Sequence, residues 1–219
     1  MSNKEFRTVK LKEILLPPEL TKEISEIYQA MQEEYEKVAD LIPLTCRGCP
    51  DNCCDSYFQH HTYSEWAYLW AGLRQLDDES LDRVTERAKE YVRKSAEVLA
   101  AGDRPQLMCP LINEDGLCAL YQHRMLVCRM HGVPATLTRP DGQSMRFPGC
   151  FRCQEIVNER FEQETDAQAM DRTLLFRRLA ALESRLMGER RHLYPRVKKT
   201  IADMIVEGPP AIDTPHCER

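Results

Sequence analysis

The longest regular pattern of apolar residues lies between residues 17 and 42. Its members recur at spacings of three and four residues: Leu20, Ile24, Tyr28, Met31, Tyr35, Val38 and Ile42. This spacing places them on one face of an α-helix of roughly six turns. Pro17-Pro18 suits the first helical turn, where proline removes no hydrogen bond. The opposite face is acidic, so we predict a helix that packs on its own domain through one side.

Two more helices follow. Thr62-Tyr-Ser-Glu65 has the pattern of a capping box and predicts a short helix that buries Trp66, Leu69, Trp70 and Leu73. Asp77 and Asp78 can cap the next helix, for which Gly102 is a natural stop. The predicted buried seam of that helix is Leu81, Val84, Ala88, Tyr91 and Val98.

The helical spacing of apolar residues is lost between about residues 104 and 150. Asn113-Glu-Asp-Gly116 and Pro140-Asp-Gly142 each lie between short apolar runs and predict hairpin turns. The stretch after Cys153 is predicted to be helical again, and a last helix from about 195 to 206 ends at Gly208-Pro-Pro210. The predicted buried face of the first of these is Met170, Leu174, Leu175, Leu179, Leu182 and Leu186.

These elements predict a mainly α fold, with helices around a small irregular β-hairpin and a cysteine-rich metal-binding region. We expect a flexible lead-in over 1–16 and a cysteine-cluster domain over 17–153. C-terminal helices over 154–206 would pack on that domain, and 207–219 would be a flexible tail.

Composition narrows the class of protein. Thirty Lys and Arg against 35 Asp and Glu give a net charge of −5, which argues against general nucleic-acid binding. No stretch approaches the ~18 apolar residues of a membrane span, and the N-terminus leads into no apolar run. We therefore expect a cytoplasmic protein that binds neither membrane nor nucleic acid. In a reducing compartment its ten cysteines are expected to be metal ligands or redox thiols rather than disulfides.

The first group of cysteines reads Cys46-Arg-Gly-Cys49-Pro-Asp-Asn-Cys53-Cys54. A CxxC turn directs two sulfurs at one point, and Cys53 extends the set to three thiols in eight residues. Neighbouring side chains tend to diverge, so Cys54 is expected to serve a second centre or to lie behind the first.

The second group lies between residues 109 and 153. Cys109 and Cys118 flank the Asn113–Gly116 turn and are expected to lie roughly opposite each other. Cys128-Arg-Met-His131 has the spacing of a Cys/His ligand pair, and Cys150-Phe-Arg-Cys153 is a second CxxC. A zinc site or a cubane iron–sulfur cluster takes about four ligands. Nine thiols therefore suggest two centres with one thiol left over, or one centre surrounded by extra thiols.

The pattern resembles the bacterial YkgJ-like cysteine-cluster family, described as a zinc- or iron-chelating domain, which includes flagellin lysine N-methylase. The residues that carry the resemblance are Cys46-x-x-Cys49-x-x-x-Cys53-Cys54, Cys109-Pro110, Gly116-x-Cys118, Tyr121, Arg124-x-x-x-Cys128-Arg129 and Gly132. The resemblance implies metal ligation by Cys46, Cys49, Cys53, Cys54, Cys109, Cys118, Cys128 and Cys150. This sequence departs from the family's pattern at two positions. Met125 stands where the family commonly has proline, and His131 follows the Cys128 motif.

Other candidate residues surround these motifs. Arg124 and Arg129 flank Cys128 and would compensate the negative charge of a thiolate site or bind an anionic cofactor; the alternative is a surface salt bridge. His60-His61 and the terminal His216-Cys217 are interpreted as surface residues, and Trp66 and Trp70 as core.

We therefore predict a metal-binding protein with an iron–sulfur cluster or zinc in one or two centres, with Cys153 added to the eight ligands above. Its role would be redox chemistry or protein modification, on a protein substrate or partner, or an accessory to such an enzyme. An iron–sulfur oxidoreductase and a lysine N-methylase-like enzyme are both compatible with the pattern. The alternatives are a structural zinc module for protein–protein interaction and a metal delivery protein.

Overall fold

The computed structural model describes residues 12–45 and 53–212. The helices are α1 (Pro18–Leu41), α2 (Tyr63–Leu73), α3 (Asp78–Ala100), α4 (Leu126–Met130), α5 (Phe151–Arg160), α6 (Thr173–Met187) and α7 (Ile201–Val206). Short 3₁₀ turns are η1 (Cys53–Asp55), η2 (Tyr121–His123), η3 (Glu164–Asp166) and η4 (Glu189–Leu193). The strands are β1 (Lys12–Glu13), β2 (Ala135–Thr138), β3 (Ser144–Phe147), β4 (Met170–Asp171) and β5 (Ala211–Ile212). The mainly α prediction is thus confirmed.

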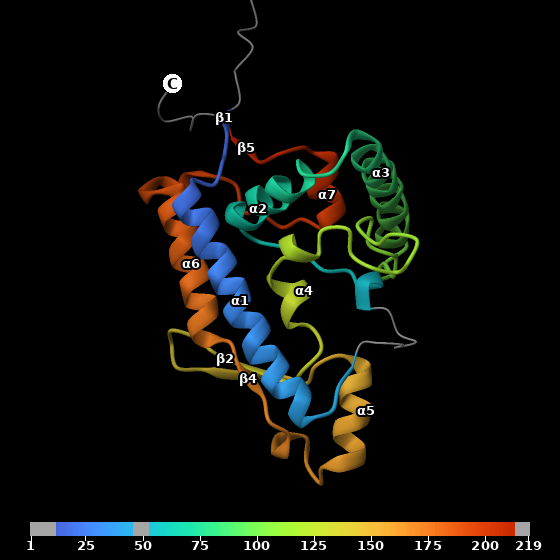
Figure 1. Cartoon of the computed structure of the whole chain (residues 1–219), viewed down its shortest axis with the longest axis vertical. Helices are drawn as coiled ribbons and strands as arrows, with labels where there is room; N and C mark the ends of the chain where they lie inside the picture. The colour runs from blue at the N-terminus through green and yellow to red at the C-terminus, as the bar shows by residue number, and fades with distance from the viewer. Residues whose placement is uncertain (1–11, 46–52, 213–219) are drawn as a thin grey trace, which may run out of the picture.

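One hydrophobic core lies around α1. Figure 1 shows α1 and α6 running side by side, with α4 on the other flank of α1. The predicted stripe of α1 is buried here, from Leu20 at 7% exposure to Ile42 at 0%, except that Tyr35 is half-buried. We call this the α1–α6 core; its other members include Leu126, Met130, Cys153, Val157, Met170, Leu179 and Leu182.

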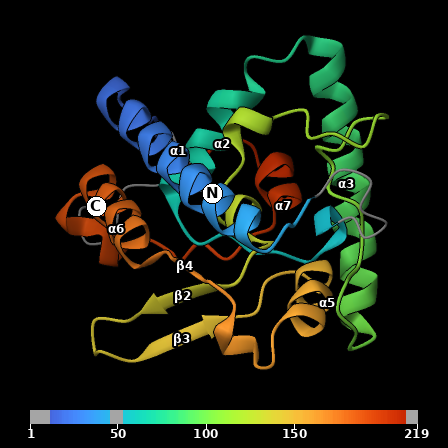
Figure 2. The same ribbon diagram turned by 60° about the horizontal axis from the view of Figure 1, so that its bottom comes forward.

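A second core lies between α2, α3 and α7. Figure 2 shows these three helices around one region of the molecule, while the β2–β3 hairpin and α5 lie at another end. Val84, Ala88 and Tyr91 of α3 are buried as predicted, and the Asp77 carboxylate caps α3 by accepting from Ser80 N at 2.8 Å. We call this the α2–α3 core; its other members include Trp66, Leu69, Leu73, Leu111, Leu120, Met125, Met204 and Ile205.

Two small sheets complete the fold. The Pro140–Gly142 turn joins β2 and β3 in the predicted antiparallel hairpin, with Ala135 opposite Phe147. Strand β4 adds to β2 in parallel, with Ala135 opposite Met170. At the chain's described ends, β1 pairs antiparallel with β5.

The C-terminal half differs from the sequence-based prediction in several places. Met170 is buried, but it belongs to β4 and not to the helical face that starts at Thr173. Leu174 is 70% exposed, because the buried face of α6 passes through Leu175, Leu179 and Leu182. The last helix begins at Ile201 rather than at about 195, because Thr200 and Asp203 form its capping box. Helix α5 also runs across the expected boundary between 153 and 154.

Candidate metal centre

The two cysteine groups are joined by backbone pairing. In turn η1, Cys54 O accepts a hydrogen bond from Cys109 N at 2.9 Å, and Asp55 O accepts one from Leu107 N at 3.0 Å. Ser56 and Gln106 form an antiparallel bridge beside them. Because each bond joins residues about fifty positions apart, Cys53 and Cys54 cannot move away from Cys109 without breaking this ladder.

Cys118 is positioned by the turn predicted at Asn113–Gly116. Leu117 N donates to the Asn113 side chain at 2.8 Å, and Asn113 N donates to Leu117 O at the same distance. Beyond this turn, Cys118 forms an isolated bridge with Ile112 and not with Cys109. The expectation that Cys109 and Cys118 face each other across a regular hairpin is therefore wrong in register, although both lie against the α2–α3 core.

Cys128 lies on helix α4, within a stretch where the sequence pattern showed no helical period. The start of α4 is held by Glu65, which is 3% exposed on α2. Leu126 N donates to Glu65 Oε1 at 2.9 Å, and the Tyr28 hydroxyl donates to the same oxygen at 3.3 Å. Instead of closing a full capping box with the Thr62 backbone, this carboxylate ties α4 to α1 and α2.

Five cysteines come within electrostatic reach of one another, and we call them the five-thiol cluster: Cys53, Cys54, Cys109, Cys118 and Cys128. Cys54 interacts with the thiols of Cys109, Cys118 and Cys128. Cys128 interacts with Cys118 and Cys53. The cluster therefore draws its members from η1, the 107–118 segment and α4.

Burial controls the thiol pKa values in this cluster. It raises the pKa of Cys109 to about 12 and that of Cys128 to about 12, with neighbouring thiols adding to the rise. Burial also raises the pKa of Cys118, although Arg124 and Arg129 partly oppose it. Without a cation nearby, these thiols therefore stay protonated at neutral pH.

Cys53 and Cys54 point toward each other rather than diverging. The hydrogen bond from the Cys53 thiol to the Cys54 sulfur lowers the pKa of Cys54 and raises that of Cys53. This differs from the expected divergence; both residues belong to the 3₁₀ turn η1. A lowered thiol pKa favours the thiolate, which is the form that binds metal.

The chemistry of the donors in the cluster fits zinc or iron, since both accept several thiolates. Among residues 12–45 and 53–212, however, no three His, Cys, Asp or Glu side chains are gathered closely enough to hold a metal ion by themselves. Cys46 and Cys49, both predicted ligands, lie outside the described residues. So does Cys217.

Cys150 and Cys153 lie elsewhere, at the start of α5. Cys150 is the N-cap, and its sulfur accepts from Cys153 N at 3.4 Å. Cys153 is fully buried in the α1–α6 core, where burial first, and then Cys150 and Glu164, raise the pKa of Cys153 to about 11. None of the five-thiol cluster contributes to that shift. In the described chain these two thiols are therefore neighbours at the start of α5, and their role as metal ligands stays a prediction.

Arg124 and Arg129 both act on the cluster's electrostatics, but Arg129 has a clear structural task. It is 8% exposed and donates to Arg124 O at 2.7 Å and Gln122 O at 2.6 Å. Arg124 stacks 3.7 Å over the Tyr121 ring, and its buried Nε has no hydrogen-bond partner among the described residues. Charge compensation at Cys118 fits both residues, whereas cofactor binding stays a prediction.

The histidines near the cluster differ in their environment. His60 is 2% exposed, so its interpretation as a surface residue is wrong. Its Nδ1 lies 3.9 Å from Glu65 Oε1, and neither ring nitrogen has a hydrogen-bond partner in the described chain. Burial lowers the pKa of His131, whose ring packs edge-on against Phe58 at 4.9 Å between centroids.

Sequence reasoning missed the role of Glu65. Burial raises the pKa of this carboxyl, but the His60 ring and hydrogen bonds from Leu126 and Thr62 outweigh it, so the net pKa is lowered. Its negative charge also raises the pKa of Cys128. The signal in the sequence was an acidic residue one position before Trp66, within a run of apolar residues.

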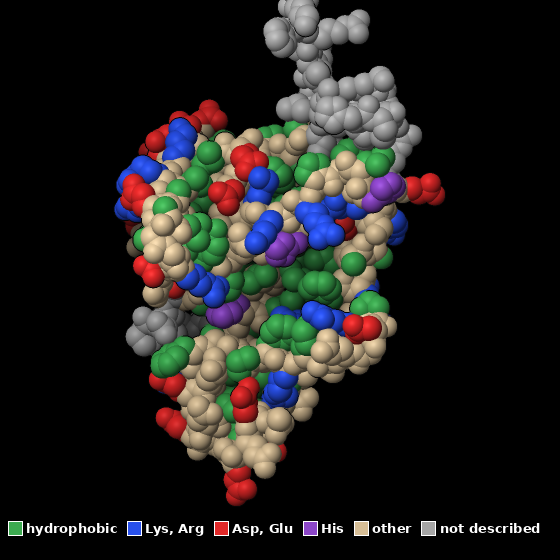
Figure 3. Space-filling view, turned by 180° about the vertical axis from the view of Figure 1, so that it is seen from behind, with side chains coloured by type: hydrophobic (Ala, Val, Ile, Leu, Met, Phe, Trp, Pro, Cys, Tyr) green, Lys and Arg blue, Asp and Glu red, His purple; other side chains and the backbone are tan. Residues whose placement is uncertain are grey.

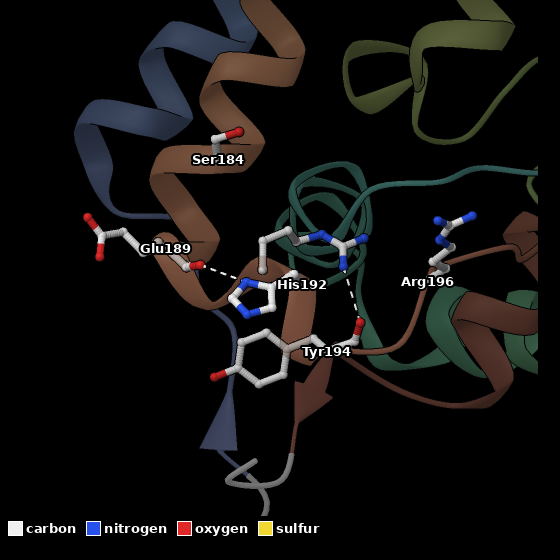
Figure 4. Close-up of a pocket in the computed structure, with 7 residues that line it drawn as sticks. Ser184, Glu189, His192, Tyr194 and Arg196 are labelled. Atoms are coloured by element: carbon white, nitrogen blue, oxygen red, sulfur yellow. Dashed lines mark hydrogen bonds between the residues drawn. The ribbon is translucent and has the colours of Figure 1, made fainter. Parts of the chain in front are cut away.

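A surface cavity of about 760 Å³ lies away from the cysteines, at the end of α6. Figure 4 shows His192 beside the backbone of Glu189, whose carbonyl oxygen lies 3.0 Å from His192 Nδ1. Arg191, also in its wall, forms an ion pair with Glu183 at 3.3 Å between Nε and Oε1. The charge of Arg191 is thus already neutralised by Glu183, and we assign this cavity no role.

Comparison with known families agrees with this geometry. Residues 45–147 match the CxxCxxCC model, described as "Putative zinc- or iron-chelating domain". We refer to these matched residues as the CxxCxxCC domain. The CxxCxxCC domain contains all five thiols of the cluster together with Cys46 and Cys49, and it ends before Cys150. This confirms the family resemblance seen in the sequence.

Two further comparisons, with curated proteins and with solved structures, found no relative of the chain. None of the helices in the described segments has the length and apolar character needed to span a membrane.

Proposed function

We propose that the CxxCxxCC domain binds zinc or iron through the five-thiol cluster, with Cys46 and Cys49 supplying further thiolates on sequence grounds. The observation that carries the proposal is the backbone ladder between Cys54 and Cys109. It brings two thiol groups from distant parts of the chain to one place, which buried structural cysteines would not require. The match to a zinc- or iron-chelating family supports the same chemistry.

The proposed centre is cytoplasmic and holds either a tetrahedral zinc ion or an iron–sulfur cluster. Seven thiols exceed the four that one centre needs, so the surplus leaves room for a cluster or for a second ion. Arg124 and Arg129 would offset the negative charge of the bound thiolates. Redox chemistry would require the iron form, whereas a zinc ion held by four thiolates would stabilise the fold. Modification of a protein partner is compatible with either metal.

The proposal is tested by purifying the protein without oxygen and measuring zinc, iron and sulfide, together with the visible absorption spectrum. We expect about one equivalent or more of metal. A brown protein that bleaches on reduction identifies the iron–sulfur form, and a colourless zinc protein identifies the structural form. Absence of both metals at stoichiometric levels would sink the proposal.

Point variants assign the ligands. Cys109→Ser and Cys128→Ser should each lower the metal content to well below half of the wild-type value, because each removes a proposed ligand. Cys153→Ala is the matched control, since it also removes a buried thiol but from the α1–α6 core. The assignment fails if Cys153→Ala loses metal while both other variants keep it.

A further inference from the structure

A second cavity of about 380 Å³ lies beside α4. Its walls are mostly apolar: Leu126, Val127 and Met130 come from α4, and Phe147 and Pro148 from the end of β3. Figure 3 shows a face of the molecule on which hydrophobic side chains gather in a hollow bordered by Lys, Arg and His side chains. The volume is within the range of small-molecule sites.

One cation, Arg172, lines this cavity. Its position is fixed because its backbone N donates to Thr136 O at 3.1 Å and because helix α6 begins at the next residue. The guanidinium lies 3.7 Å over the Phe147 ring, which covers one of its faces. The side chain therefore stands at the rim of an apolar wall in a defined orientation.

Arg172 lacks a polar partner. Its Nε is buried with no hydrogen-bond acceptor among the described residues, and within those residues no carboxylate lies at ion-pairing distance. Burial lowers the pKa of Arg172, and no neighbouring charge contributes. A half-buried guanidinium that lies against an apolar wall without a counter-ion favours an anion in the space beside it.

Two other shielded arginines are used differently. Arg146, on the neighbouring strand, donates from Nη2 to Glu164 O at 2.9 Å and to Ala167 O at 2.7 Å. Arg129 likewise donates to two carbonyls. These side chains close loops within the chain, whereas Arg172 faces an open cavity.

We propose that this cavity is a binding site for a small molecule that carries one carboxylate on a short apolar body. The planar guanidinium matches a carboxylate through two parallel hydrogen bonds, and the walls from α4 and β3 take the apolar part. A single cation favours a monoanion over a phosphate, which would call for more positive charge. No cysteine of the five-thiol cluster lines this cavity, although Cys128 lies on the same helix as Val127 and Met130.

The test compares hexanoate with hexanamide, which has the same apolar chain but no charge. Binding to the full-length protein is followed by NMR chemical shifts in a titration. We expect saturable binding of hexanoate at least about tenfold tighter than that of hexanamide, since a charge-assisted pair is worth that much or more. Equal binding of the two probes, or no saturable binding of hexanoate, would overturn the proposal.

Variants locate the site. Arg172→Met keeps the apolar length of the side chain and should weaken hexanoate binding about tenfold while leaving hexanamide binding unchanged. Arg139→Met is the control, because it removes the same charge from the exposed β2–β3 turn. Wild-type hexanoate affinity in Arg172→Met contradicts the assignment. If that variant does not fold, the comparison of the two probes on the wild-type protein still decides the matter.

Discussion

At the scale of single residues, burial governs the chemistry of Cys109 and Cys128. Each has a pKa raised to about 12 in the folded chain, against about 8.5 for an exposed thiol. Between those values the unfolded chain loses thiol protons that the folded chain keeps. Without metal, the folded state is therefore favoured below about pH 8.5, and that advantage is lost as the pH rises toward 12.

This predicts that the metal-free protein becomes less stable in mildly alkaline solution. The free energy of unfolding, measured by urea denaturation with chelator and reductant present, should fall between about pH 7.5 and pH 9.5. A Cys109→Ala/Cys128→Ala double variant should show a shallower fall over the same interval. A stability that rises with pH in the wild-type protein would contradict the burial of these thiols.

The cysteine spacing indicated the zinc- or iron-chelating family that the comparison found, but it could not predict where each thiol lies in the fold. The CxxC at Cys150 looks like the one at Cys46 in the sequence, yet Cys153 is inside the α1–α6 core. Only tertiary packing separates such a pair from the cluster. Glu65 was hidden for a similar reason, because its partners Tyr28 and Leu126 are distant in the sequence.

At the scale of elements, Glu65 connects three helices through one carboxylate. It accepts from Leu126 N at the start of α4 and from Tyr28 on α1, and it is itself part of α2. Loss of the carboxylate would leave both donors buried without an acceptor. The placement of Cys128 on α4 thus depends on a side chain outside the cysteine motifs.

We expect Glu65→Ala to destabilise the metal-free protein by about 3 kcal/mol, from two unsatisfied donors at roughly 1–3 kcal/mol each. Glu65→Gln keeps one acceptor oxygen and should cost less than half as much. Urea denaturation measures both values. Equal costs for the two variants would show that lost charge, rather than lost hydrogen bonding, is what matters at this position.

The segment that follows α4 and the segment that precedes α5 pass close to each other at Gly132 and Gly149. Gly149 has φ of +90°, and a Cβ there would lie 2.4 Å from Gly132 O. Gly142 has a similar φ of +86°, but a Cβ at that position would meet nothing within 4 Å. Both sites strain an L-residue, but only Gly149 also lacks space.

Gly142→Ala should therefore cost about 1 kcal/mol, the penalty of the left-handed backbone alone. Gly149→Ala should cost roughly 2–4 kcal/mol, because the crowding against Gly132 adds to that penalty. Thermal unfolding of both variants makes the comparison. Similar losses would mean that the segment around Gly149 can move apart without consequence.

Long elements were predictable from the sequence and short ones were not. The stripe from Leu20 to Ile42 and the Asp77 cap identified α1 and α3, because each helix shows several turns of one buried face. Met170 matched a helical period by chance, since β4 is only two residues long and owes its existence to pairing with β2. A strand this short carries too little pattern to be recognised.

At the scale of the whole molecule, the five-thiol cluster lies where the two cores meet. Met125 belongs to the α2–α3 core, whereas Leu126, the next residue, belongs to the α1–α6 core. Cys109 and Cys118 pack on the former, and Cys128 is on α4. A metal bound across these thiols would therefore fasten one core to the other.

This arrangement predicts that metal removal weakens the coupling between the cores. Calorimetry of the zinc-loaded protein should show one unfolding transition, raised by about 10 °C or more over the chelator-treated sample. The chelated protein should unfold in a broader transition or in two. An unchanged single transition after zinc is removed would show that the cores are held together by their own packing alone.

The ladder between Cys54 and Cys109 also has a consequence in time. Its two sides are separated by the whole of α2 and α3, so it can close only after these helices have been synthesised. A nascent or partly collapsed polypeptide consequently presents no assembled thiol cluster to a passing ion. Metal binding would then be restricted to chains in which the segment between Cys54 and Cys109 has already closed.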